Sequence, residues 1–228
     1  APRAAAHAAR VDMWLEPHLA RRRDQVKHPV LDFIFTYYNY RPAHLRRWHP
    51  GYGVALAEAS EYDELKGYAS TGGAAAVTAA YVASQRRLIE GIYSLLVATA
   101  SRPPSLGCFG LHEWAMVYRE DETRHPLPLR LGASGTDAVV EPHKISCSHF
   151  DAFRFFTPQA RPLNTLTPGR DDRPEFEQPG CLHASMDLYK HAYRLSPMID
   201  SELVADCLEL AIAVREVDMR ASPYDLSA

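Results

Sequence analysis

The segment GAAAVTAAYVASQRRLIEGIYSLLVATA, residues 73–100, has the strongest helical pattern in this sequence. It is rich in alanine and leucine, which are residues of high helix propensity. Its apolar side chains recur at helical spacing and would form one inward stripe, made of Val77, Tyr81, Leu88, Ile92 and Leu95. The segment predicts one long amphipathic helix, and a protein built around it is expected to be mainly α.

Helical spacing of apolar residues recurs on both sides of this segment. We expect further helices over residues 4–24, 109–118, 181–194 and 200–220. On the last of these helices, the apolar face is expected to consist of Leu203, Cys207, Leu210, Ala211 and Val214. The chain is therefore expected to begin and end in helices.

The middle of the chain, residues 119–178, is irregular and rich in proline. A loop region of this length is usually functional or disordered, and its Phe and Leu content argues against disorder. One or two short strands could lie within residues 138–156, AVVEPHKISCSHFDAFRFF. We predict a single mainly α domain that consists of a helical half (1–100), a loop-rich middle (101–180) and C-terminal helices (181–228).

The composition is that of a globular protein, with 46% hydrophobic and 23% charged residues. The net charge of −3 gives no basic surplus of the kind that nucleic-acid-binding proteins usually carry. No apolar run is long enough to span a membrane. The four cysteines are far apart and form no C-x-x-C pair, so we expect reduced thiols in a cytoplasmic protein and no structural zinc knuckle.

The stretch CLHASMDLYKH, residues 181–191, places His183, Asp187 and His191 four residues apart. On a helix these side chains share one face, so they can reach one metal ion. Two imidazoles and one carboxylate are the ligand set of many non-haem iron sites. The alternative is a polar helix flank on which Asp187 pairs with Lys190 or His191.

Two other pairs of histidine and acid strengthen the metal hypothesis. His112 and Glu113 lie in LHEW, and His149 and Asp151 lie in SHFDAF. If residues 149–155 form a strand, His149 and Asp151 project to the same face. Carboxylates often hydrogen-bond to metal-bound imidazoles and fix their orientation. Alternatively, each pair is a local feature, such as an imidazole bonded to the backbone or a pair that closes a turn.

We therefore predict a metal-dependent enzyme that oxidises or oxygenates a small polar or aromatic substrate. The metal is expected to be Fe(II), with Mn or Zn as alternatives, because mixed imidazole and carboxylate ligands suit non-haem iron. The expected ligands are His112, His149, His183 and Asp187. The carboxylates expected to act in catalysis or to orient the ligands are Glu113, Asp151 and Asp187.

Basic and aromatic residues could hold the substrate. They lie in RPAHLRRWHPG, residues 41–51, and in RHPLPLRLG, residues 124–132, with one tyrosine in the MDLYK block. Arginine binds carboxylates and phosphates, and aromatic rings stack on flat ligands. The predicted substrate-binding residues are Arg46, Trp48, Arg124, Arg130 and Tyr189. The alternative is a set of surface arginines that pair with the acidic residues of the chain.

Several blocks of the sequence carry a resemblance to a known group. They are HPVLDFIFTYYNYRPAHLRRWHPG (28–51), GCFGLHEWAMVYR (107–119), SHFDAFRFFTPQARPLN (148–164), EQPGCLHASMDLYK (177–190) and DMRASPYDL (218–226). In these blocks the chain resembles bacterial proteins, common in actinobacteria, that are labelled 3-methyladenine DNA glycosylase. The group's pattern has Trp after MDLYK, where this sequence has His191.

The resemblance implies an alternative function, an N-glycosylase (a hydrolase) that removes an alkylated purine from DNA or cleaves a nucleoside. Such an enzyme needs a carboxylate, for which Asp32, Asp151 or Asp187 could serve. It also needs rings that stack on the extruded base, for which the candidates are Tyr37, Tyr38 and Trp48. A third possibility is a non-catalytic binder of a small ligand. In outline the chain is also similar to the haem-oxygenase-like metal oxidases.

Overall fold

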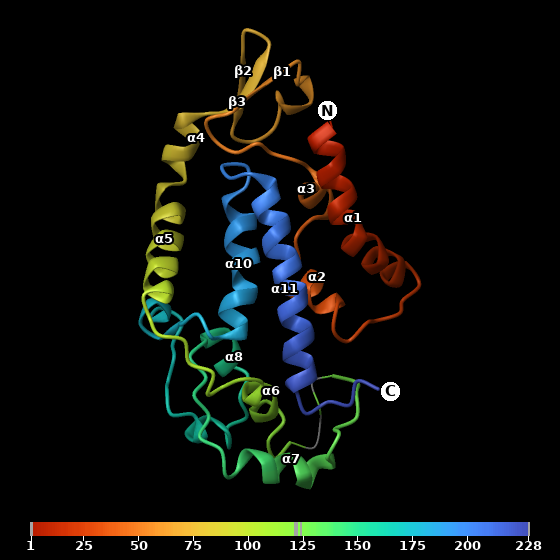
Figure 1. Ribbon diagram of the computed structural model, residues 1–228, viewed down its shortest axis with the longest axis vertical. Helices are drawn as coiled ribbons and strands as arrows, with labels where there is room; N and C mark the ends of the chain where they lie inside the picture. The colour runs from red at the N-terminus through yellow and green to blue at the C-terminus, as the bar shows by residue number, and fades with distance from the viewer. Residues whose placement is uncertain (1, 121–122, 124, 228) are drawn as a thin grey trace. The chain divides into compact units, whose positions relative to one another are not determined.

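The protein is mainly α, as predicted (Figure 1). The computed structural model describes residues 2–120, 123 and 125–227. Its α-helices are α1 (Pro2–Arg23), α2 (Asp32–Tyr37), α3 (Pro42–Arg46), α4 (Ala79–Ser84), α5 (Arg86–Ala100), α6 (Leu111–Ala115), α7 (Gly132–Val140), α8 (Phe150–Phe153), α9 (Arg173–Phe176), α10 (Leu182–Leu195) and α11 (Ser201–Ala221). The two short 3-10 helices among the described residues are η1 (Ser60–Tyr62) and η2 (Arg161–Leu163). The strands are β1 (Ala55–Ala57), β2 (Tyr68–Thr71) and β3 (Ala74–Val77). None of the described helices combines the length and the apolar character that a membrane span requires.

The chain divides into two compact units, each assembled from segments that are distant in the sequence. Unit 1 consists of residues 1–26, 35–93 and 188–210, and unit 2 of residues 27–34, 94–187 and 211–228. Both α10 and α11 contribute residues to both units. The prediction of a single domain stays a prediction.

Unit 1 contains an antiparallel sheet in the order β1-β3-β2. Residues 73–100 were expected to form one helix, but residues 74–77 form β3 and the helical part is divided at Gln85 into α4 and α5. Gly72 and Gly73 both have positive φ, 61° and 79°, as a two-residue type I′ hairpin turn requires. The turn pairs Thr71 with Ala74, so residues 74–77 become a strand. The helical part begins at Thr78, whose side chain accepts a hydrogen bond from the backbone N–H of Tyr81 (3.1 Å) and caps α4.

Unit 2 holds the irregular middle of the chain. The sequence left open one or two short strands within residues 138–156, and the structure, which describes all of these residues, has no strand there. Residues 150–153 form the helix α8, and Ile145 makes an isolated bridge to Asn164. Aromatic and aliphatic side chains of this unit form a buried core, which includes Trp114, Met116, Tyr118, Val140, Ile145 and Phe156. The middle of the chain is therefore ordered by its own core with little regular sheet structure.

The position of α6 is fixed by close packing on the C-terminal end of α11. Gly110 precedes α6 with a φ of 75°, and a Cβ at this position would lie 2.5 Å from the Cβ of Ala221. The indole N–H of Trp114 donates to the carbonyl oxygen of Ala221 at 2.8 Å. Residues 109–118 were expected to be helical, but the helix covers only Leu111–Ala115. The turn at Gly110 sets its start.

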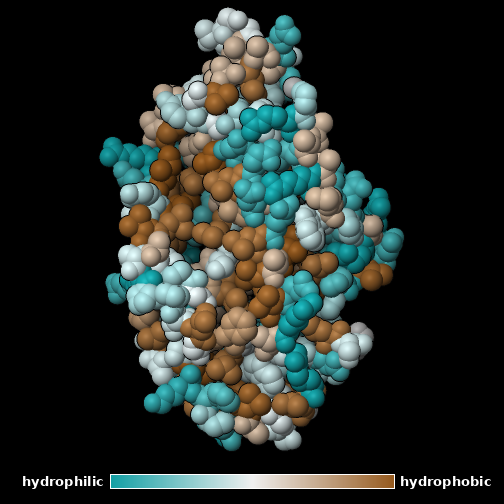
Figure 2. Space-filling view, viewed as in Figure 1, coloured by the Kyte–Doolittle hydropathy of each residue, from teal (hydrophilic) through white to brown (hydrophobic). Residues whose placement is uncertain are grey.

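The buried face of α11 differs from the expected one. Leu203 and Leu210 were expected to face inward, but they are exposed. The buried stripe consists of Ser201, Val204, Ala205, Leu208, Ala211, Ile212, Arg215, Asp218 and Met219. Apolar side chains also remain at the surface, and Figure 2 shows brown, hydrophobic groups among teal, hydrophilic ones on the visible face. The buried stripe of α11 thus contains two charged residues, Arg215 and Asp218, which were not part of the expected apolar face.

Candidate metal centre

Two histidines and one aspartate of unit 2 form a compact cluster. His112 lies on α6, His183 on the first turn of α10, and Asp218 near the end of α11. One nitrogen of each imidazole and one Asp218 oxygen all lie within 4.8 Å of one another. The two rings meet edge to face, with centroids 4.6 Å apart. A buried His/His/Asp cluster of this size could hold a metal ion.

The contact between His112 and Asp218 is close but is not a hydrogen bond. His112 Nε2 lies 2.9 Å from Asp218 Oδ1, yet neither atom has a partner with hydrogen-bond geometry among the described residues. Nδ1 of His183 is also buried without such a partner. Buried polar atoms almost always have partners, so three orphaned atoms in one place require an explanation. A shared cation would satisfy donor atoms that converge without bonding to one another.

An arginine is buried beside the cluster. Arg215 is 1% exposed, and its Nη1 donates to Glu113 Oε1 at 2.9 Å and to Asp218 Oδ2 at 2.8 Å. Its guanidinium lies over the Phe33 ring, 4.1 Å from the centroid. Two carboxylates and one guanidinium leave one negative charge, which a buried site must balance with a proton or a metal ion.

Burial and neighbouring charges shift the pKa of each cluster member. Burial lowers the pKa of His112, but the Asp218 carboxylate more than offsets this and raises it to about 9. Burial alone would raise the pKa of Asp218, but His112 and the other cationic neighbours hold it below its usual range. The pKa of His183 lies well below its usual value because the ring is buried and faces His112. The cluster thus keeps Asp218 ionised and His183 neutral, which are the forms that bind metals, whereas His112 carries a proton at neutral pH that a bound metal ion would displace.

Three cysteines surround a small hollow that His112 and His183 also line. The hollow has a volume of about 10 Å³, which is about the space of one water molecule. Cys108 Sγ lies 3.7 Å from His112 Nδ1. A hydrogen bond from Cys108 lowers the pKa of Cys147 to about 6 against the opposing effect of burial, whereas burial raises the pKa of Cys181 to about 12.

A second buried group surrounds His149, which is the neighbour of His183 with ring centroids 5.5 Å apart. His149 Nε2 lies 3.4 Å from Glu177 Oε1 and 3.4 Å from Asp187 Oδ2. Arg173 bonds to both carboxylates, at 2.8 Å in the case of Asp187. His149 and Asp187 were predicted as ligands, but they lie in this arginine-held group, and Asp218 is the carboxylate of the cluster.

The other predicted carboxylates have different partners from those expected. Asp151 was expected to orient His149, but its carboxylate pairs with Arg154 at 3.2 Å, and Glu177 and Asp187 are the acids at His149 Nε2. Glu113 was expected as a ligand or a catalytic acid, and it is held by Arg215. Glu113 therefore lies next to the cluster, one residue from His112, without belonging to it.

Most of the predicted substrate-binding residues belong to unit 1, whereas the cluster lies in unit 2. Arg46 pairs with Asp12 at 2.5 Å and with Glu16 at 3.4 Å, both on α1. Trp48 is buried beneath the guanidinium of Arg3. These side chains are therefore engaged in the packing of unit 1.

Tyr189 is also in unit 1, where it is buried edge-on against the rings of Tyr38 and Tyr40. His191 lies in the same unit, two turns beyond His183 on α10. Arg130, in unit 2, donates to the carbonyl oxygens of Tyr224 and Arg220 and thus ties the C-terminal segment in place. Arg124 lies outside the described residues.

Asp218 and Arg215 are the residues of the site that the sequence patterns did not predict. The signal that could have found them is the helical phase of α11. At spacings of three and four residues, Leu208, Ala211 and Ile212 lead directly to Arg215 and Asp218. Charged residues in an apolar stripe are almost never buried without partners, so this phase indicates a functional or paired site.

Comparison with known proteins gives no match for this chain. No family model, no curated protein and no solved structure matches it.

Proposed function

We propose that His112, His183 and Asp218 bind one divalent metal ion and that the protein is a metal-dependent oxidoreductase of the non-haem iron type. Two imidazoles and one carboxylate are the donor set of non-haem iron centres, and the same set also accepts Mn or Zn. The proposal is supported by a set of donor atoms within 4.8 Å of one another. Iron is proposed first because two imidazoles and one carboxylate, once the ion has displaced the His112 proton, leave further positions of the ion open for a reactant.

The observation that carries the proposal is the pair formed by His112 Nε2 and Asp218 Oδ1. These atoms lie 2.9 Å apart, buried, with no hydrogen-bond partner for either. A structural ion pair at this position would be expected to align the N–H with the carboxylate oxygen. Two ligands of one metal ion need not be aligned with each other in this way, because each directs its lone pair at the metal.

The surrounding residues would prepare the ligands. Arg215 donates to Oδ2 of Asp218 and so leaves Oδ1 free for the ion. If His112 donates from Nδ1 to Cys108 Sγ, its Nε2 carries the lone pair that a metal needs. A bound iron would supply a redox centre and a Lewis acid.

The hollow limits what can reach the centre. Its volume of about 10 Å³ admits a molecule of the size of water, far below the roughly 300 Å³ of pockets that enclose larger ligands. We therefore expect that the molecule approaching the metal from this side is as small as water or dioxygen. The predicted aromatic substrate would require the residues lining the hollow to move.

Elemental analysis of the purified protein tests the proposal. We expect about one equivalent of iron, manganese or zinc per chain, after reconstitution with Fe(II) if necessary, as the three-ligand cluster implies. His183→Ala should lose this metal, whereas His143→Ala should keep it because His143 is an exposed histidine outside the cluster. A wild-type metal content that stays far below one equivalent after reconstitution contradicts the proposal. Equal contents in both variants would place the metal elsewhere.

The N-glycosylase alternative stays a prediction. It needs cationic and aromatic residues that are available to DNA. Trp48, which was predicted to stack on the base, is buried, and Arg46, which was predicted to bind the substrate, is paired with acids of α1. Release of 3-methyladenine from alkylated DNA by the metal-free protein would favour this alternative over the oxidoreductase.

A further inference from the structure

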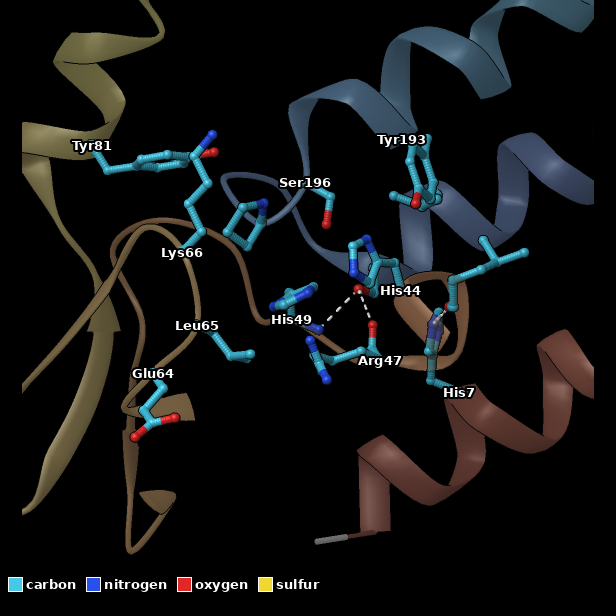
Figure 3. Close-up of a pocket in the computed structure, with 14 residues that line it drawn as sticks. His7, His44, Arg47, His49, Glu64, Leu65, Lys66, Tyr81, Tyr193 and Ser196 are labelled. Atoms are coloured by element: carbon cyan, nitrogen blue, oxygen red, sulfur yellow. Dashed lines mark hydrogen bonds between the residues drawn. The ribbon is translucent and has the colours of Figure 1, made fainter. Parts of the chain in front are cut away.

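Unit 1 contains a pocket of about 280 Å³ that the proposed metal centre does not involve (Figure 3). Its walls come from α1, α3, the loop after α3, the segment before β2, α4, the end of α10 with the turn that follows it, and the start of α11. All of the residues that line it belong to unit 1. It is slightly smaller than pockets for drug-sized ligands, so its ligand should be a small metabolite.

The pocket has an excess of positive charge. Arg47 and Lys66 line it, and Glu64 is the one carboxylate among the described residues of the lining. Figure 3 draws the Glu64 carboxylate directed away from His49 and Arg47. Within the described ranges, neither Arg47 nor Lys66 has an acidic partner, and the Lys66 ammonium lies 6.0 Å from the centroid of the Tyr81 ring. These two cations are thus available to a ligand.

One nitrogen of a buried imidazole in the lining has no hydrogen-bond partner within the described part of the chain. His7 is 1% exposed, and its Nε2 lies 2.9 Å from the carbonyl oxygen of Leu45. Because a carbonyl oxygen only accepts, Nε2 must carry a proton, and in the neutral form of the ring Nδ1 is then an acceptor. Nδ1 is buried with no hydrogen-bond partner among the described residues. A bound molecule with a hydroxyl or amide donor would satisfy it.

We infer that this pocket binds a small phosphate monoester, with the phosphoryl group between Arg47 and Lys66 and the organic part against the apolar wall. A phosphate monoester carries a charge of about −1.5 to −2 near pH 7, which matches two unpaired cations better than the single charge of a carboxylate does. Arginine and lysine are the usual partners of phosphate oxygens. The wall for the organic part consists of Leu45, Leu65, Pro197 and Val204.

His49 contributes to this site as a neutral group. It lies at the base of the pocket, its backbone N–H donates to Ser201 Oγ, and its Nδ1 is 2.9 Å from the Tyr68 hydroxyl. Burial and the positive charge of Arg47 lower the pKa of His49 to about 4. At neutral pH the positive charge of the pocket therefore comes from Arg47 and Lys66, and these are the residues to test.

Isothermal titration of the full chain with phenyl phosphate, benzoate and inorganic phosphate tests the inference. Phenyl phosphate should bind at least about tenfold more tightly than benzoate, because it carries the second charge, and inorganic phosphate should compete with it. Arg47→Met and Lys66→Met should each weaken phenyl phosphate binding by about tenfold or more. Arg87→Met, which removes an exposed arginine outside the pocket, is the matched control and should change the affinity by less than about twofold.

Two results would overturn the inference. One is the absence of phenyl phosphate binding at about 10 mM, a concentration well above the Kd of a specific site. The other is binding that both Arg47→Met and Lys66→Met leave unchanged. The metal-site variant His183→Ala should keep full phenyl phosphate affinity, because His183 lies in unit 2. Loss of binding in that variant would assign the phosphate to the metal centre and reject the pocket.

Discussion

Asp218 is a charged residue in the apolar stripe of α11, and it is fully buried. A buried carboxylate needs compensation, because an isolated charge in a protein interior is strongly unfavourable. Arg215 bonds to one oxygen of Asp218, and His112 lies 2.9 Å from the other. At the scale of single residues, the charge of Asp218 is therefore balanced by Arg215 at one oxygen, and its other oxygen lies close to the imidazoles of His112 and His183.

The substitution Asp218→Asn tests the role of this oxygen. Asparagine has the same shape and can still accept a hydrogen bond from Arg215, so we expect the protein to fold. It lacks the negative charge, and we expect metal affinity to fall by about 100-fold or more, since a ligand is lost. Metal content measured after dialysis against a fixed metal concentration checks this. The control is Glu216→Gln, which neutralises an exposed carboxylate on the same helix. Equal retention in the two variants would remove Asp218 from the ligand set.

At the scale of elements, α6 brings His112 to α11 through one glycine. Gly110 has a φ of 75°, a backbone conformation that residues other than glycine rarely adopt. Its backbone also packs closely against Ala221. The two-glycine hairpin at residues 72–73 shows the same principle in unit 1, where it turns the expected start of a helix into a strand. In both places, a positive φ that glycine adopts readily decides where an element begins: α6 after Gly110, and β3 after Gly73.

The substitution Gly110→Ala should destabilise the protein. An alanine Cβ would lie 2.5 Å from the Ala221 Cβ and 2.9 Å from its carbonyl oxygen. We expect a loss of about 2–4 kcal/mol in the free energy of unfolding, from overpacking and from the cost of positive φ. The matched control is Gly91→Ala, within α5, where a Cβ meets nothing within 4 Å. This change should stabilise by about 0.5–1 kcal/mol. Urea denaturation of both variants measures the difference, and a neutral Gly110→Ala would contradict the close contact.

At the scale of the whole molecule, stability should depend on the bound metal. A ligand that binds only the folded state stabilises it by about 2.7 kcal/mol when present at 100 times its Kd. We therefore expect metal saturation to raise the Tm of the wild-type protein and a chelator to lower it. In Asp218→Asn the Tm should respond to neither, which thermal unfolding can measure. A chelator effect of equal size in both proteins would point to a different metal site.

Stability should also depend on pH through His49. Its pKa is lowered from 6.5 to about 4, chiefly by burial and then by the neighbouring Arg47, His7 and His44. The unfolded chain therefore takes up a proton at a higher pH than the folded protein does. The contribution of neutral His49 is complete above about pH 6.5 and is lost as the pH falls towards 4, to a total of about 3 kcal/mol.

The variants that isolate this effect are His49→Gln and, as the control, His143→Gln. His49→Gln removes the titrating ring, so the difference between the wild-type and variant free energies of unfolding should shrink as the pH falls from about 6.5 to 4. His143 is an exposed histidine of unit 2, so its replacement leaves the surroundings of His49 intact and should keep the loss of stability that is attributed to His49. Urea denaturation at a series of pH values measures these slopes. Parallel curves for wild type and His49→Gln would show that His49 does not titrate as inferred.

The sequence by itself determined the helical class and two of the three cluster residues. Apolar spacing identified α1, α5, α10 and α11, because each helix carries its periodicity in local sequence. His112 and His183 stood out because imidazoles beside acids are a local pattern as well. The differences from expectation have local causes too: a Gly-Gly turn interrupts the alanine-rich stretch, and α11 carries apolar residues on its exposed side as well as on its buried side.

Only the tertiary structure decided which carboxylate joins the two histidines. Asp187 shares a helix face with His183, yet it bonds to Arg173, and Asp218 is instead the residue beside His112. The periodicity of a sequence indicates which residues share a face of one helix, but it does not indicate which face packs against another helix. Apolar residues such as Leu203 and Leu210 also lie on the exposed side of α11, so the pattern alone could not select its buried side. The contact of Gly110 with Ala221 settles the choice, because it places α6 against the end of α11 and brings His112 to Asp218.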